Sequence, residues 1–133
     1  MNHEIEIKYT TTITTEHITN VLSMESGGFD YWGEICFEQE DYEAARVRLL
    51  NKGQNSDMLC YEDVLAEILE SGRALKVWDR EEDKYYPLDL AVLLKGFKLF
   101  VEDACSPDDL EDLDGSCADI IIQFALFGEI IYS

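Results

Sequence analysis

The sequence predicts one α+β domain spanning residues 1–133, with three or four helices packed on a small, mostly antiparallel sheet. Two observations lead to this prediction. Helical periodicity and short β-type segments follow one another along the chain, and two of the β-type segments flank a polar turn as in a hairpin. In addition, 47% of the 133 residues are hydrophobic, which is enough for a substantial core in one domain of this length.

The N-terminal part is predicted to form a strand, a helix and a second strand. Polar and apolar residues alternate over residues 4–13, and the segment is rich in β-formers, so it favours a strand. Thr15 then caps a helix that Gly27 and Gly28 end, and whose apolar residues share one face: Ile18, Val21 and Leu22. Residues 29–38 suit a second strand, although their start could instead continue the preceding turn.

The middle of the chain holds the clearest helical signal. Residues 41–51 are compatible with either a helix or a strand extension, and residues 52–56 are predicted to be a loop. Residues 61–71 are expected to form a helix that Gly72 ends. Its apolar residues recur at helical spacing, with acids on the other side: Tyr61, Val64, Leu65, Ile68 and Leu69.

A hairpin and two helices are predicted for the remainder. Residues 74–78 and 84–88 flank the polar turn 79–83, and Asp89 caps the helix that follows. Ser116 and Asp119 are spaced like a capping box for the last helix. That helix is apolar nearly all round, so we expect it at the centre of the fold, followed after Gly128 by a short strand over 129–132.

The charge of the chain limits its possible partners. A net charge of −19 and a pI near 4.1 argue against direct binding to nucleic acid or an anionic membrane, because phosphate contact needs Lys and Arg. We therefore expect a basic partner: a nucleic-acid-binding protein, a basic peptide or a divalent metal. The N-terminus lacks the features of a signal peptide, and no apolar run is long enough to span a membrane. These features predict a soluble protein of the cytoplasm.

No motif in the sequence indicates catalysis or a bound cofactor. Glycine-rich phosphate loops, nucleophile elbows and zinc-protease helices are all missing from the sequence. The two histidines, His3 and His17, have no nearby Cys, Ser or second His, so both are expected at the surface. Without a C-x-x-C pair, the cysteines are expected to be free thiols in apolar sites: Cys36, Cys60, Cys105 and Cys117. The prediction is a non-enzymatic protein, with no cofactor and no metal site.

Three sequence segments resemble a known group of proteins. These are residues 93–99 after a hairpin containing Lys76–Asp79, the apolar tail 118–130, and Gly27–Gly28 followed by Tyr31–Trp32. They resemble small uncharacterised acidic proteins encoded by phages and integrated mobile elements of Gram-positive bacteria, over most of the chain. The group has no settled activity, so the resemblance implies no functional residues. It implies a mobile genetic element, a setting in which small acidic proteins often counter host defences.

The acidic connector 102–114 is the strongest candidate site. Residues 99–133 carry nine carboxylates and no Lys or Arg. The connector could be a solvated loop that favours the dipole of the next helix. An EF-hand is excluded because, with Gly115 at the sixth position, Leu110 and Ile121 would be ligands. A third interpretation is phosphate mimicry, in which carboxylates enter a channel that grips a nucleic-acid backbone. This interpretation assigns partner binding to Asp108, Asp109, Glu111, Asp112 and Asp114.

Two further acidic patches could extend such a surface. One is the hairpin turn, which carries Asp79, Glu81, Glu82 and Asp83, and the last three of these are expected to bind the partner. The other lies around the second strand and comprises Glu34, Glu38, Glu40, Asp41 and Glu43. Strand alternation places Tyr85 and Tyr86 on opposite faces, so one of them, Tyr85 in the predicted site, can serve as an interface anchor.

The leading hypothesis is therefore an anti-CRISPR or anti-restriction inhibitor, in which an acidic protein imitates DNA and occupies a CRISPR effector or restriction enzyme. The alternative is an acidic adaptor or homo-oligomeric accessory protein of the mobile element, such as a homodimer, that binds through an apolar patch. A metal-dependent enzyme that uses carboxylates alone is a third class, which a rise in melting temperature with divalent metal would reveal.

Overall fold

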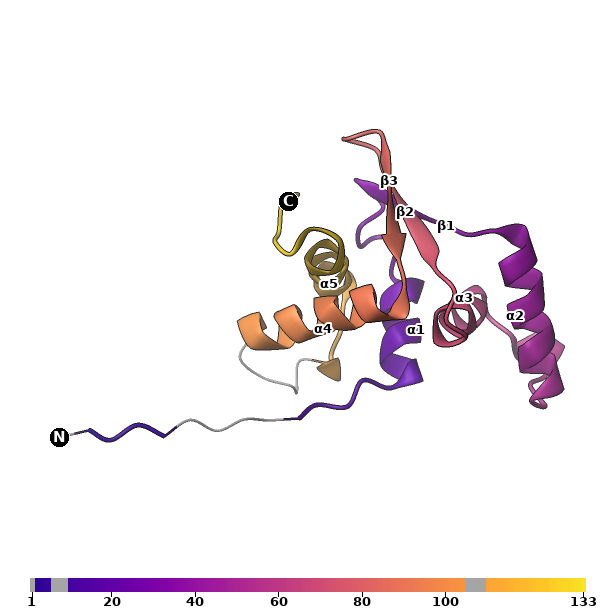
Figure 1. The fold of residues 1–133 in the computed structure, drawn as a ribbon, viewed down its shortest axis with the longest axis horizontal. Helices are drawn as coiled ribbons and strands as arrows, with labels where there is room; N and C mark the ends of the chain where they lie inside the picture. Colours follow the sequence, from indigo (N-terminus) through magenta and orange to yellow (C-terminus); the bar gives the residue numbers. More distant parts are fainter. Residues whose placement is uncertain (1, 6–9, 105–109) are drawn as a thin grey trace.

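The computed structural model describes residues 2–5, 10–104 and 110–133. Within this part of the chain, five α-helices and one three-stranded antiparallel sheet form a single α+β domain (Figure 1). The α+β prediction is confirmed, but there are five helices rather than three or four. The elements in chain order are α1 Thr15–Ser23, β1 Gly33–Cys36, α2 Gln39–Asn51, the 3₁₀ turn η1 Ser56–Met58, α3 Tyr61–Glu70, β2 Leu75–Asp79, β3 Lys84–Leu88, α4 Leu90–Ala104 and α5 Gly115–Phe127.

The sheet has the order β1-β2-β3, with β2 in the centre. Its inner face is apolar, and Ile35, Val77 and Leu88 on it are buried. Because side chains point to alternate faces along a strand, the residues between these buried ones point outward. In the register of the sheet these form two rows on the other face, Glu34–Trp78–Tyr85 and Cys36–Lys76–Pro87. The hairpin predicted from residues 74–88 is thus confirmed, and it carries most of this outward face.

The two strands predicted at the chain ends are wrong for the residues that the structure describes. Neither residues 2–5 nor residues 10–13 pair with the sheet, and Ile5 is 83% exposed. Residues 129–132 also lack strand pairing. Their main-chain partners are instead the side chain of Gln123, whose Oε1 accepts from the N–H groups of Ile131 and Tyr132 at 2.8 Å. An alternating sequence does not by itself provide a strand to pair with. Here the side chain of Gln123 bonds the main-chain groups that a neighbouring strand would otherwise bond.

Two of the predicted helix caps are displaced by one or two residues. Thr14, not Thr15, is the N-cap of α1, and its Oγ1 accepts from the N–H of His17. Asp114, not Ser116, caps α5, since its Oδ1 accepts from the N–H of Cys117 at 2.8 Å. The predicted Asp89 cap of α4 is confirmed by the hydrogen bond from the N–H of Val92 to Asp89 Oδ1 at 2.8 Å.

His17 is not a surface residue. It is buried, and its Nδ1 accepts from the N–H of Thr14 at 3.0 Å, which completes a capping box at the start of α1. Because Nδ1 is an acceptor, the neutral ring carries its proton on Nε2, 3.4 Å from Glu111 Oε1. The predicted apolar site is wrong for Cys60, which is exposed, whereas Cys36 and Cys117 are half-buried and Cys105 lies outside the described residues.

None of the helices among the described residues is long and apolar enough to cross a membrane.

Candidate partner-binding surfaces

The connector between α4 and α5 is only partly described. Asp108 and Asp109 lie outside the described residues. Glu111 and Asp112 are exposed, and Glu111 is the neighbour of His17. Asp114 has a structural task as the N-cap of α5, and the hydrogen bond from the N–H of Cys117 lowers the pKa of its carboxyl group. Of the three described connector acids in the predicted site, Glu111 and Asp112 are therefore the ones free for a partner.

The start of α1 brings further acids to the same end of the molecule. Thr15 Oγ1 donates to Glu70 Oε1 at 2.6 Å, which places the end of α3 beside the first turn of α1. His17 in that same turn lies beside Glu111. We call the resulting surface the α1 acidic face; it comprises Glu16, Glu70, Glu111 and Asp112. Among the described residues, none of these four carboxylates has a Lys or Arg within ion-pair distance.

The hairpin turn presents a second acidic surface. Asp79 at the end of β2 is fully buried, and its Oδ1 accepts from the N–H groups of Glu81 and Glu82 at 3.0 and 3.2 Å. This arrangement fixes the turn and leaves the side chains of Glu81, Glu82 and Asp83 exposed. We call these three residues the hairpin tip. Within the described chain, none of them pairs with a Lys or Arg side chain.

The two surfaces do not form one row of charges. In Figure 1 the hairpin tip is at the top of the view, whereas the start of α1 and the described end of the connector are at the bottom. The helices α4 and α5 lie between these two levels. A partner that contacts both surfaces must therefore reach around the body of the domain.

Three of the five acids of the third predicted patch have a basic neighbour, whereas Glu40 and Glu43 have none among the described residues. Glu34 Oε2 lies 3.8 Å from Arg80 Nη2, and Glu38 Oε1 lies 3.7 Å from Lys76 Nζ. Asp41 Oδ1 accepts from Arg73 Nε at 3.0 Å. On the neighbouring helices, Arg48 and Lys52 both contact the buried Glu67 at 3.3 and 3.0 Å. The basic residues in these contacts lie around α2 and the sheet, away from the α1 acidic face. Arg80 and Lys84 flank the hairpin tip in the sequence, but among the described residues neither forms an ion pair with its three acids.

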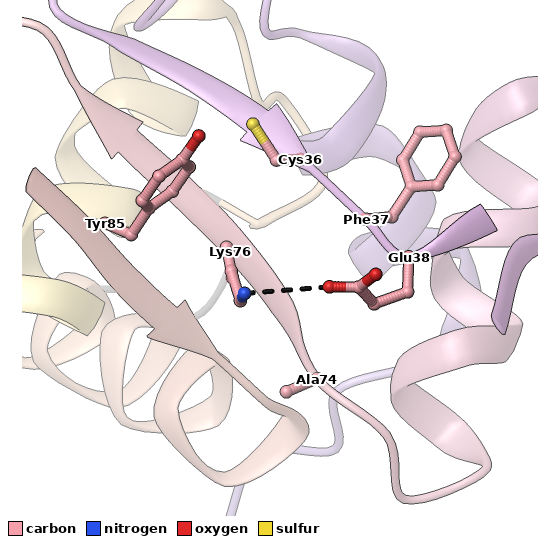
Figure 2. Close-up of a pocket in the computed structure, with 6 residues that line it drawn as sticks. All are labelled: Cys36, Phe37, Glu38, Ala74, Lys76 and Tyr85. Carbon is pink, nitrogen blue, oxygen red and sulfur yellow. Dashed lines mark ion pairs between the residues drawn. The ribbon is translucent and has the colours of Figure 1, made fainter. Parts of the chain in front are cut away.

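The outward face of the sheet carries an aromatic pair. The rings of Trp78 and Tyr85, opposite each other on β2 and β3, have centroids 4.6 Å apart. Tyr85 is 55% exposed, whereas Tyr86 is half-buried and packs edge-on against Phe127, as strand alternation predicted. A hollow of about 260 Å³ lies beside Tyr85, and Figure 2 shows the side chains that line it. Its lining comprises Cys36, Phe37, Glu38, Ala74, Lys76 and Tyr85.

One polar network was not predicted from the sequence. Asp119 on α5 accepts from Trp32 Nε1 and from Tyr31 Oη, both at 2.7 Å, and from Gln123 Nε2 at 2.9 Å. The Tyr132 hydroxyl donates to Asp79 Oδ2 at 2.8 Å. The signal for this network is the i, i+4 spacing of Asp119 and Gln123 on an otherwise apolar helix. Since each of these groups has a partner, the network joins α5, the hairpin and the C-terminal residues and is structural.

The described side chains offer no group of three or more His, Cys, Asp or Glu that could hold a metal ion. No protein-family model matches the chain, and neither a curated protein nor a solved structure matches it.

Proposed function

We propose that the protein is a non-enzymatic inhibitor, encoded by a phage or mobile element, that binds a basic nucleic-acid channel of a host defence complex such as a CRISPR effector or restriction enzyme. Binding is by competition, with carboxylates taking the places of phosphates on Lys and Arg of the channel. Because duplex DNA carries about one charge per 1.7 Å of its axis, such channels are rich in basic side chains.

The observation that carries this proposal is the separation of paired from unpaired acids. The acids beside the basic residues, such as Glu67 and Asp41, are held in ion pairs. Among the described residues, the exposed acids of the hairpin tip and of the α1 acidic face have no Lys or Arg within ion-pair distance, and only Glu111 has a histidine, His17, at 3.4 Å. Unpaired charges raise the self-repulsion of the domain, and a basic partner would relieve that cost and be attracted at long range.

The first experiment is affinity capture of the tagged protein from a lysate of a bacterium with restriction and CRISPR systems. The expected result is a nucleic-acid-binding complex that is released by moderate salt and displaced by added duplex DNA. Three double variants identify the surface: E81K/E82K at the hairpin tip, E111K/D112K at the α1 acidic face, and E40K/E43K on α2 as a control with the same change in net charge.

Reversal at a contacting surface should weaken binding by about tenfold or more, because like charges are then placed together, whereas the α2 control should change it far less. Equal binding by all three variants, or a captured complex that duplex DNA does not displace, would refute the mimicry proposal.

A second candidate function is that of a homo-oligomeric accessory protein. The observation that favours it is an exposed apolar group near the C-terminus, comprising Tyr31, Ile130 and Ile131. Light scattering after size exclusion would give a dimer mass that persists at high salt, and I131K would return it to a monomer. A monomer at all concentrations would remove this candidate.

A further inference from the structure

The sheet can bind a partner through only one of its surfaces. Its inner face is buried against the helices. Because the N–H of Arg80 donates to the carbonyl of Trp32, the main chain of Gly33 and Ile35 points away from β2. Three of these outer groups are already bonded. Glu25 accepts from the N–H of Ile35, Arg80 Nη1 donates to the carbonyl of Gly33 at 3.3 Å, and the N–H of Gly33 donates to the carbonyl of Phe29 at 2.8 Å.

The opposite edge of the sheet, β3, is blocked by a proline. The same alternation directs the main chain of Tyr85 and Pro87 outward, and Pro87 has no N–H to offer to an added strand. Strand addition is therefore blocked at both edges, as is usual for protected sheets. The outward face with Trp78 and Tyr85 is the surface that remains for a partner.

This face already holds a cation. Lys76 Nζ lies 5.8 Å from the centroid of the Tyr85 ring and 3.7 Å from Glu38 Oε1. Figure 2 shows the ammonium of Lys76 between the ring of Tyr85 and the carboxylate of Glu38. All three residues line the hollow of about 260 Å³. Both contacts are weak, because the side chains of Lys76 and Glu38 are more than half exposed. A cation from outside can therefore take the place of this ammonium.

We propose that this face binds an arginine side chain of a basic protein partner, which stacks on Tyr85, the ring neighbour of Trp78, and pairs with Glu38 in place of Lys76. The planar guanidinium can stack on an aromatic ring and bind a carboxylate at the same time, whereas an ammonium is a point charge. The hollow is below the usual range of small-molecule sites, about 300–1,000 Å³, and suits a single side chain. The inference rests on the proposed function, since it names what the basic partner inserts.

The test is a titration with two blocked probes, hexa-arginine and hexa-lysine, followed by NMR of the two indole N–H signals. Trp78 is the reporter, and the buried Trp32, whose indole donates to Asp119, is the internal reference. We expect hexa-arginine to shift the Trp78 signal, leave Trp32 unmoved, and bind about fivefold more tightly than hexa-lysine.

Two pairs of variants distinguish binding at this site from the general electrostatic attraction of a cationic probe to the acidic protein. K76Q should raise the affinity for hexa-arginine several-fold, whereas K95Q, which removes the same charge at an exposed position of α4, should raise it far less. Y85A should abolish the preference for arginine, and Y85F should keep it because the ring remains. A gain of affinity in K76Q cannot come from misfolding.

Equal binding of the two probes, or equal effects of K76Q and K95Q, would overturn the inference. The proposed function is judged separately, by capture of the host complex. If E81K/E82K or E111K/D112K lowers capture while Y85A does not, the mimicry proposal stands and the arginine site falls. If Y85A alone lowers capture, the arginine site stands and the mimicry proposal falls.

Discussion

Asp79 is fully buried at the base of the hairpin turn and accepts three hydrogen bonds. Two come from the N–H groups of Glu81 and Glu82, and the third from the hydroxyl of Tyr132 at 2.8 Å. Burial and the neighbouring Asp79 carboxylate raise the pKa of Tyr132, so its hydroxyl remains a donor at neutral pH. One carboxylate thus fixes the acidic tip and attaches the C-terminal residues to it.

Replacing Asp79 with alanine should destabilise the fold by about 3 kcal/mol, because three donors lose a charged acceptor at once. Y132F removes one of these bonds and should cost about 1 kcal/mol. Urea unfolding monitored by tryptophan fluorescence measures both values. E82A, at the exposed tip, is the control and should leave the free energy of unfolding nearly unchanged; an equal loss in E82A would contradict the role given to Asp79.

The cap at Asp114 predicts a dependence of stability on pH. Its pKa is below the ordinary value of 3.8, chiefly because its carboxylate accepts from the N–H of Cys117. A carboxyl group whose pKa is lower in the folded state stabilises the fold above its unfolded pKa and loses that contribution as the pH falls through the folded value. The contribution is therefore complete at neutral pH and disappears below about pH 4.

D114A should lose about 1 kcal/mol at pH 7, as is usual for an N-cap, and the difference from the natural chain should shrink toward pH 3. D114N keeps an oxygen acceptor that does not titrate, so it should be close to the natural chain at pH 7. Thermal melts at a series of pH values test this. S116A is the matched control. If S116A lost as much stability as D114A, Ser116 rather than Asp114 would be the N-cap of α5.

At the scale of secondary-structure elements, the packing of α4 against α5 depends on Gly96. A Cβ at this position would lie 2.8 Å from the Cβ of Ala125 and would also collide with the carbonyl oxygen of Ile121. The close approach of the two helices therefore requires the absence of a side chain. It also explains a glycine in the middle of α4, where alanine would otherwise favour the helix by about 1 kcal/mol.

G96A should consequently destabilise the protein by about 1–3 kcal/mol despite the higher helix propensity of alanine, because the two helices must move apart. K95A, one residue earlier and exposed, should be neutral or slightly stabilising. Guanidinium unfolding of both variants gives the comparison. A G96A variant more stable than the natural chain would show that α4 and α5 can move apart without loss of stability.

The elements with a strong apolar pattern could be predicted, and the others could not. The periodicity of α3 and the polar turn of the hairpin gave their positions within a residue or two, and Asp89 gave the start of α4. The end of α4 was misplaced, because the helix continues to Ala104, three residues into the segment 102–114 that was predicted as the connector. By contrast, α2 buries only Ala45 and Leu49 along its 13 residues, so its pattern could not separate helix from strand. Residues 4–13 alternate as a strand does, but alternation does not provide a neighbouring strand.

For the candidate site, the sequence indicated which residues are acidic but not which are free. Asp79 and Asp114 were assigned to charged surfaces, whereas their carboxylates hold the hairpin turn and the start of α5. Glu34 and Glu38 gain basic neighbours only through the pairing of β1 with the hairpin. Such pairings depend on contacts distant in the sequence, whereas the exposure of Tyr85 followed from local alternation alone.

At the scale of the whole molecule, the net charge of −19 acts on stability and on binding in opposite directions. Repulsion among the exposed acids opposes the compact state, whereas attraction to a basic channel favours the complex. Salt screens both interactions, with a Debye length of about 30 Å at 0.01 M and about 10 Å at 0.1 M. The same addition of salt should therefore stabilise the free protein and weaken the complex.

We expect the melting temperature of the free protein to rise by several degrees between about 0.01 and 0.3 M KCl, since a gain of 1 kcal/mol shifts a domain of this size by about 2–8 °C. The chloride is chosen because sulfate would stabilise any fold through exclusion from its surface.

E81K/E82K and E40K/E43K, which lower the net charge equally, should both show a smaller rise. Binding to the captured complex should fall over the same range of salt, and only the tip variant should reduce that fall. A melting temperature independent of salt would mean that the charges are already balanced within the fold, which would remove the reason for expecting a basic partner.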